Sequence, residues 1–217
     1  DFSTFVRDTP MIFWKDSMGN WRVYFKSKYQ SLAECGKPVI YLYPEKQTDL
    51  SISVSPNGGF TKTDPNPIDG WWHVSASPDG TLYSYPDKQS YPYLFWEGKA
   101  FGFGFPTEGF VFAKDDVEEE MKLVLAQFGL QEQETADFLE FWLPLMTESP
   151  YVFVTFADEQ EYSAAAPIRI SEPLDSSLRV FMKFTPLEKP MTVEPLQIEK
   201  KERKGFTLIE WGGLLEK

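Results

Sequence analysis

Three glutamates of this 217-residue chain have positions that suit acid–base chemistry. Glu97 lies between Trp96 and Gly98 at the end of an apolar stretch, where a carboxylate is partly desolvated and its pKa rises. Glu108 and Glu210 are candidate partners, because two carboxylates on either side of a glycosidic bond perform its hydrolysis. We favour a structural explanation, in which Glu97 caps backbone amides or pairs with a Lys or Arg, because acids at strand ends are common.

The single His and the single Cys restrict nucleophilic and metal chemistry. One His excludes sites built from several His, and any Ser-His-Asp triad would depend on His73. His73 follows Trp71 and Trp72 and could act as a base beside an aromatic surface, but no nucleophile motif accompanies it, which favours a His stacked on a sheet. One Cys excludes an internal disulfide and paired-Cys zinc motifs, so we interpret Cys35 as incidental.

Two loops contain residue types that also occur in ligand-binding motifs. Asp64, Asn66 and Asp69 supply alternating oxygen donors that would suit Ca²⁺. They lack the spacing and final Glu of an EF-hand, and the prolines between them favour a structural turn. Residues 101–105, Phe-Gly-Phe-Gly-Phe, lack the Lys and the following helix of a phosphate loop. Neither a metal nor a cofactor is therefore expected.

Aromatic side chains give a stronger indication of function. Of the 36 aromatic residues, 23 lie within residues 1–110. Faces of Tyr and Trp stack on sugar rings or on peptides, and hairpin geometry would gather several of them on one surface. The predicted ligand-binding residues are Trp71, His73, Tyr83, Tyr85, Tyr91, Tyr93 and Glu97. The alternative is an aromatic layer that covers a sheet beneath the N-terminal hairpin or the helices.

The elements that must position these residues are mostly strands in the first half of the chain. Residues 39–43 form an unbroken apolar run before Pro44, which predicts a strand covered on both faces. Leu50, Ile52 and Val54 alternate with serines, which predicts one buried and one exposed face. The turn at residues 77–80 and the segments 81–85 and 93–96 extend the strand pattern, which predicts paired strands.

Helical periodicity appears after residue 112. Apolar residues from Val117 to Phe128 recur on one helical face, with Gly129 at the position of a C-terminal cap. A second helix is predicted from about residue 131, ending or kinking at Pro144. Strands resume at 151–156, 178–184 and 206–211. The polar stretch 157–173 is predicted to be a surface excursion, and the charged run 200–204 a solvated loop.

These patterns predict an α+β protein with an antiparallel, sandwich-like β-rich domain, an inserted acidic helical hairpin and C-terminal strands. We place an N-terminal β-hairpin and connector in residues 1–35 and a single α+β domain in residues 36–217. Within that domain the β-rich part covers 36–112, the helical hairpin 115–147 and the C-terminal strands 151–217.

The formal charge of −12 is concentrated in one segment. Residues 115–161 contain 13 acidic side chains and one Lys, and the remainder of the chain is balanced. This acidity argues against binding to nucleic acid, whose phosphates need a basic surface. No apolar run is long enough to span a bilayer. The helical hairpin is instead expected to present an acidic face to which a basic protein could dock.

Three sequence blocks resemble those of a family of uncharacterised microbial proteins. The blocks are Lys37-Pro-Val-Ile-Tyr-Leu-Tyr-Pro44, Tyr93-Leu-Phe-Trp-Glu-Gly98 and Gly205-Phe-Thr-Leu-Ile-Glu-Trp-Gly-Gly213. The resemblance covers roughly residues 36–213, including the helical hairpin block at 128–144, and leaves out the N-terminal hairpin. It brings no activity, cofactor or catalytic residue.

The sequence leaves three functions open. The first is a non-catalytic binding or assembly module that contacts a glycan or peptide through exposed Tyr and Trp. The second is a carboxylate-dependent hydrolase that uses Glu97 with Glu108 or Glu210. The third is a protein-interaction domain that uses the acidic hairpin. The aromatic-rich β pattern favours an exported or surface protein, whereas the start at Asp1 fits either a removed signal peptide or a trimmed chain.

Overall fold

The structure, a computed structural model, describes residues 11–15, 21–25 and 33–215, which belong to two units that divide after Leu32. The first unit contributes an antiparallel strand pair, β1 (Met11–Lys15) and β2 (Trp21–Phe25). The second unit begins at Ala33 with the first residue of β3. Residues 33–35, which the sequence assigned to a polar connector, are therefore part of a strand. The second unit contains every site considered below.

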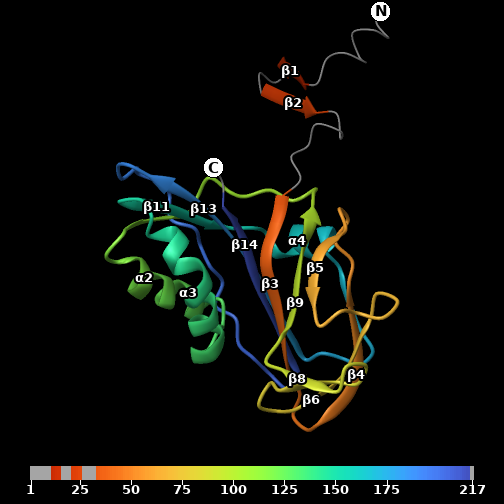
Figure 1. The fold of residues 1–217 in the computed structure, drawn as a ribbon. Coiled ribbons are helices and arrows are strands. Elements are labelled where there is room, and N and C mark those ends of the chain that lie inside the picture. The colour runs from red at the N-terminus through yellow and green to blue at the C-terminus, as the bar shows by residue number, and fades with distance from the viewer. Residues whose placement is uncertain (1–10, 16–20, 26–32, 216–217) are drawn as a thin grey trace, which may run out of the picture. The chain divides into compact units, whose positions relative to one another are not determined.

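The second unit is built on a seven-stranded sheet (Figure 1). All neighbouring strands run antiparallel except the central pair β13–β14, which is parallel. In order across the sheet the strands are β10 (Phe110–Ala113), β11 (Tyr151–Phe156), β13 (Ser176–Leu187), β14 (Thr207–Leu215), β3 (Ala33–Tyr43), β9 (Leu94–Ala100) and β5 (Phe60–Asp64).

A five-stranded sheet packs on one face of the large sheet. Its strands in order are β12 (Ile168–Ile170), β4 (Thr48–Val54), β6 (Trp72–Ala76), β7 (Leu82–Ser84) and β8 (Gln89–Tyr91). Ile40 and Trp96 from the large sheet share a core with Ile52, Trp72 and Val74 from the small one. Because apolar faces of two sheets bury each other in this way, the predicted sandwich-like α+β fold is confirmed.

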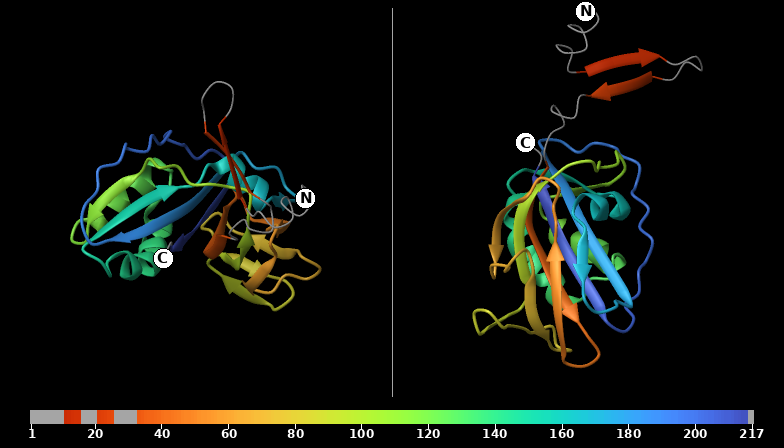
Figure 2. Two further views of the ribbon diagram at one scale, coloured as in Figure 1. Left: turned by 90° about the horizontal axis from the view of Figure 1, so that it is seen from above. Right: turned by 90° about the vertical axis from the view of Figure 1, so that its right-hand side faces the viewer.

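Two helices cover the opposite face of the large sheet, so the layers run helices, large sheet, small sheet (Figures 1 and 2). They are α2 (Val117–Gln127) and α3 (Glu132–Met146). Val39 and Tyr41 of β3 pack in the core beneath the helices, whereas Ile40 and Leu42 pack between the sheets. The unbroken apolar run of β3 therefore reflects burial on both faces, as predicted.

The two helices form the predicted hairpin. Gly129 follows α2 with a φ of +88°, the left-handed conformation that a C-terminal glycine adopts readily. Gln131 and Glu134 form a reciprocal capping box at the start of α3. The predicted end at Pro144 is wrong, because α3 continues to Met146 with Pro144 in its last turn, and the alternative of a kink there stays a prediction. None of the described helices is long and apolar enough to cross a membrane.

The stretch predicted as a surface excursion, residues 157–173, is ordered and partly buried. It contains α4 (Glu159–Ala165) and β12, and the Tyr162 side chain is 1% exposed. Asp158 caps α4 by accepting hydrogen bonds from the backbone N–H groups of Gln160 and Glu161. The prediction failed because α4 is short and offers little helical periodicity to recognise.

The charged run 200–204 also differs from the predicted solvated loop. Arg203 donates two hydrogen bonds to the Glu134 carboxylate, at 3.1 and 2.8 Å, and a third to the Gly129 carbonyl at 2.7 Å. Lys201 forms an ion pair with Glu159. These contacts tie the run to both the helical hairpin and α4, although its partners lie far away in the sequence.

Candidate functional site

The outer face of the five-stranded sheet brings together part of the predicted ligand-binding set. Strand register places Ser51 opposite His73 and Ser75 opposite Tyr83. Their alternate neighbours, such as Ile52 and Val74, point into the core between the sheets. The Tyr85 backbone N–H donates to the His73 carbonyl, so Tyr85 continues the same face. This surface, which we call the tyrosine face, comprises Asp49, Ser51, His73, Ser75, Tyr83 and Tyr85.

Hydrogen bonds fix the geometry of the tyrosine face. The Tyr85 hydroxyl donates to Asp49 Oδ1 at 2.6 Å. This bond, with Ser75 assisting, lowers the pKa of Asp49 and keeps its carboxylate ionised. Ser51 Oγ and His73 Nδ1 lie 2.8 Å apart. The Tyr83 and Tyr85 rings contact each other edge to face, with centroids 5.6 Å apart, and remain 37% and 46% exposed.

The other predicted ligand-binding residues lie elsewhere. Tyr91 is paired opposite Leu82, whose side chain points into the core, so Tyr91 lies on the inner side of the small sheet. Its hydroxyl donates to Asp87 at 2.7 Å, which raises the pKa of Tyr91 to about 12. Tyr93 packs against Tyr41 at 5.4 Å, beside the core under the helices. Trp71 is half-buried and immediately precedes β6.

The structure does not assemble the predicted carboxylate pairs. Trp96 points between the sheets and donates to Glu210, so its neighbour Glu97 projects from the opposite face of β9. Glu108 precedes β10, which is five strands away from β9, about 24 Å as measured along the sheet. Carboxyl pairs of glycosidases lie within about 10 Å of each other. Glu97 instead lies opposite Lys62 of β5.

Glu210 belongs to a buried polar cluster between the sheets. It is fully buried, and its Oε2 accepts a hydrogen bond from Arg179 Nε at 2.6 Å. Its Oε1 accepts from Trp96 Nε1 at 2.9 Å. The parallel pairing of β13 with β14 places Arg179 beside Glu210. Burial by itself lowers the pKa of Arg179, but the charge of Glu210 outweighs it and raises that pKa, so the guanidinium stays charged.

Tyr162 and Cys35 border this cluster. The Arg179 guanidinium lies 4.6 Å from the centroid of the Tyr162 ring. Neither the Tyr162 hydroxyl nor Arg179 Nη2 has a hydrogen-bond partner among the described residues. Burial, reinforced by Glu210, raises the pKa of the Cys35 thiol to about 12. The thiol is therefore protonated and unreactive at neutral pH, in agreement with its interpretation as incidental.

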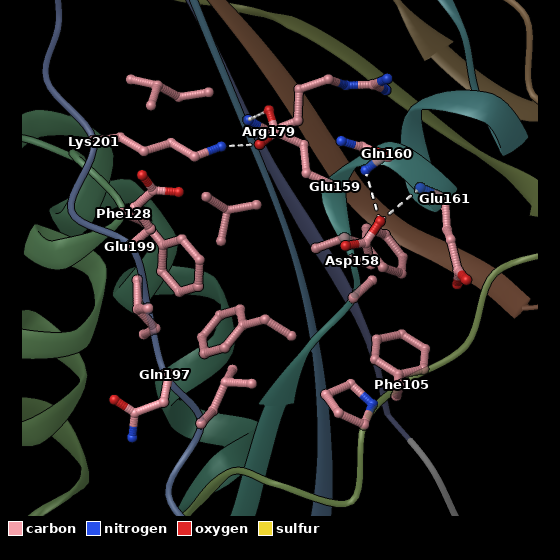
Figure 3. A pocket seen from close by; sticks show the side chains of 18 of the residues that line it. Phe105, Phe128, Asp158, Glu159, Gln160, Glu161, Arg179, Gln197, Glu199 and Lys201 are labelled. Atoms are coloured by element: carbon pink, nitrogen blue, oxygen red, sulfur yellow. Dashed lines mark hydrogen bonds and ion pairs between the residues drawn. The ribbon is translucent and has the colours of Figure 1, made fainter.

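A groove opens beside β13, at the edge that β11 leaves unpaired (Figure 3). Its volume is about 710 Å³, within the usual range for ligand sites. One wall is residues 196–199 with Lys201, and the other is the first turn of α4 with residues 104–106. Apolar side chains that include Phe128, Phe156 and Val180 also line the groove. The ion pair between Lys201 and Glu159 bridges the two walls.

The loops singled out in the sequence have structural contacts. Asn66 Oδ1 accepts a hydrogen bond from Thr63 at 3.0 Å, and Trp72 Nε1 donates to the Pro65 carbonyl at 2.6 Å. No cluster of three or more His, Cys, Asp or Glu suited to a metal occurs within the described part of the chain. Phe103 and Phe105 pack against Phe181, with ring centroids 5.6 and 6.2 Å from it.

The sequence analysis missed the groove and the pairing of Arg179 with Glu210. A usable signal for the pair was Arg179 between the apolar residues Leu178 and Val180, because a charge in such a stretch needs a buried partner. The identity of that partner, Glu210, depended on a strand pairing that the sequence does not reveal. Comparison of the chain with protein-family models, with curated proteins and with solved structures found no match.

Proposed function

We propose that the chain is a non-catalytic binding module and that the tyrosine face binds a neutral oligosaccharide. The supporting observation is the pair Tyr83 and Tyr85, two exposed rings in edge-to-face contact, with His73 and the ionised carboxylate of Asp49 on the same face. One face of a sugar ring is apolar and stacks on an aromatic ring, while its hydroxyls bond to carboxylate and imidazole.

The tyrosine face is also organised before any ligand arrives. The hydroxyl of Tyr85 is held by Asp49, and His73 is held by Ser51. Side chains that are already ordered lose little conformational entropy on binding, so each contact contributes more to affinity. The separation of Glu97 and Glu108 and the opposite orientation of Glu97 and Glu210 weigh against the hydrolase alternative.

Isothermal titration calorimetry with a panel of neutral oligosaccharides tests the proposal. We expect saturable binding that is weakened at least about tenfold by Tyr85→Ala, because a stacking surface and an Asp49 contact are removed together. Tyr91→Ala is the matched control, since Tyr91 belongs to the same sheet but points to its inner side. Binding to no member of the panel, or equal loss in both variants, would contradict the proposal.

A further inference from the structure

The groove beside β13 occupies the place of a missing strand. β11 pairs with β13 only from Met182 to Leu187, and the chain leaves the sheet after Phe156 to form α4. The first half of β13, from Ser176 to Phe181, therefore has β14 on one side and no strand among the described residues on the other. An unpaired strand edge is a template for hydrogen bonding with another extended chain.

At one end of the open edge, two hydrogen bonds within the chain satisfy backbone groups of β13 that a neighbouring strand would otherwise bond. The Ala157 backbone N–H donates to the Phe181 carbonyl at 2.9 Å. The Arg179 backbone N–H donates to the carboxylate of Glu159 at 3.3 Å, so a side chain stands in for a strand carbonyl. Because backbone groups alternate along a strand, Ser177 directs its own groups to the same open side. Ser177 is exposed, it immediately precedes the groove-lining residues of β13, and no hydrogen bond from the described residues reaches these backbone groups.

The groove carries an excess of negative charge after the charges paired within it are set aside. Both basic side chains that line it form ion pairs, Arg179 with Glu210 and Lys201 with Glu159. Three further carboxylates line it, those of Asp158, Glu161 and Glu199. Asp158 and Glu161 accept backbone hydrogen bonds, and Glu199 is exposed with no ion pair to any described residue. An apolar floor with an acidic rim suits a partner with apolar and cationic side chains.

We propose that this groove binds an extended peptide segment of a partner protein, in which apolar residues alternate with Lys or Arg. The segment adds as a strand beside the backbone groups of Ser177 and the Arg179 carbonyl, because the Arg179 N–H is already bonded to Glu159. Its apolar side chains contact the floor formed by Phe128 and Val180. Its basic side chains lie against the rim carboxylates. The groove shares no residue with the tyrosine face, so peptide binding here and oligosaccharide binding there can be tested independently.

Fluorescence anisotropy with labelled synthetic peptides tests this inference on the full chain. The probe is a short amidated peptide of alternating lysine and valine. We expect saturable binding that weakens as salt is raised, because the contacts with the rim are partly exposed. A peptide of alternating glutamate and valine should bind at least about tenfold more weakly. The lysine peptide with a methylated backbone should also bind weakly, because it cannot donate to a strand edge.

Variants locate the binding to the groove. Glu199→Lys reverses a charge on the rim and should weaken the lysine peptide about tenfold. Glu194→Lys is the matched control, because it makes the same charge change at an exposed position outside the groove lining. No binding of the lysine peptide, or equal binding of the lysine and glutamate peptides, would overturn the inference. Equal effects of the two variants would overturn the assignment to the groove, and unchanged binding after backbone methylation would overturn strand addition.

Discussion

Replacement of Glu210 by Gln isolates the charge of the buried Arg179–Glu210 pair. Glu210 is fully buried, and the Arg179 side chain is 4% exposed. Gln keeps an oxygen in place for the Trp96 indole N–H, which donates to Glu210 at 2.9 Å, so the substitution removes the negative charge and little else. The guanidinium of Arg179 is then left charged between the sheets without a counter-ion.

The expected cost follows from the burial of both partners. Removing one member of a buried ion pair costs about 3–5 kcal/mol, because the remaining charge stays desolvated. For a domain of this size that loss lowers the melting temperature by roughly 6–20 °C. Arg179 Nη2 already has no partner within the described chain, so the pair is imperfectly satisfied. We therefore expect that Arg179→Met combined with Glu210→Leu costs much less than the sum of the two single changes.

Urea unfolding followed by tryptophan fluorescence measures each free energy of unfolding in this cycle. We expect Glu210→Gln and Arg179→Met each to lose about 3–5 kcal/mol and the double variant to recover at least about 2 kcal/mol of the sum. A loss below about 1 kcal/mol for Glu210→Gln would refute the reasoning, because it would mean that the charge of Arg179 is solvated without its partner. If the loss in the double variant equals the sum of the losses in the two single variants, the pairing of Arg179 with Glu210 itself is refuted.

Three further predictions concern stability and reactivity. The thiol of Cys35, whose pKa is raised to about 12 by burial, should react with a disulfide reagent at pH 8 only after the protein is unfolded in urea. Burial opposes ionisation of Glu134, but the hydrogen bonds from Arg203 and Tyr43 prevail and lower its pKa below the ordinary 4.5. The ionised Glu134 carboxylate therefore stabilises the folded state above pH 4.5, and this stabilisation is lost as the pH falls through the folded-state pKa. Glu134→Gln should accordingly make the free energy of unfolding, measured in urea, fall less steeply on the acid side. Asp158→Ala removes the cap of α4 and should cost about 1 kcal/mol by the same measurement, whereas no loss would show that the cap is dispensable.

Elements with a strong local pattern could be predicted from the sequence. The apolar face of α2 together with Gly129 specifies a helix and its end. The unbroken apolar run of β3 specifies burial on both faces. Elements without such a pattern could not be predicted. α4 is too short for a helical period to stand out, and α3 continues two residues past Pro144 although the Pro nitrogen has no hydrogen to donate within the helix.

The sites depended on contacts between distant segments. Tyr83, Tyr85 and His73 share a face because neighbouring strands place them there, and their spacing around turns made that part predictable. Tyr91 could not be placed, since a shift of one residue in register moves a side chain to the other face. The groove arises where β11 stops pairing with β13, which no local pattern encodes.

The single histidine of the chain provides the most direct test of the proposed function. The ring of His73 lies on the tyrosine face, so its Cε1–H signal in ¹H–¹³C NMR spectra of the untagged protein reports binding there without ambiguity. We predict that this signal shifts saturably during titration with a neutral oligosaccharide and stays fixed in Tyr85→Ala at the same concentrations. A signal that stays fixed in the wild-type protein while the oligosaccharide binds, or throughout the whole panel, would contradict the proposal.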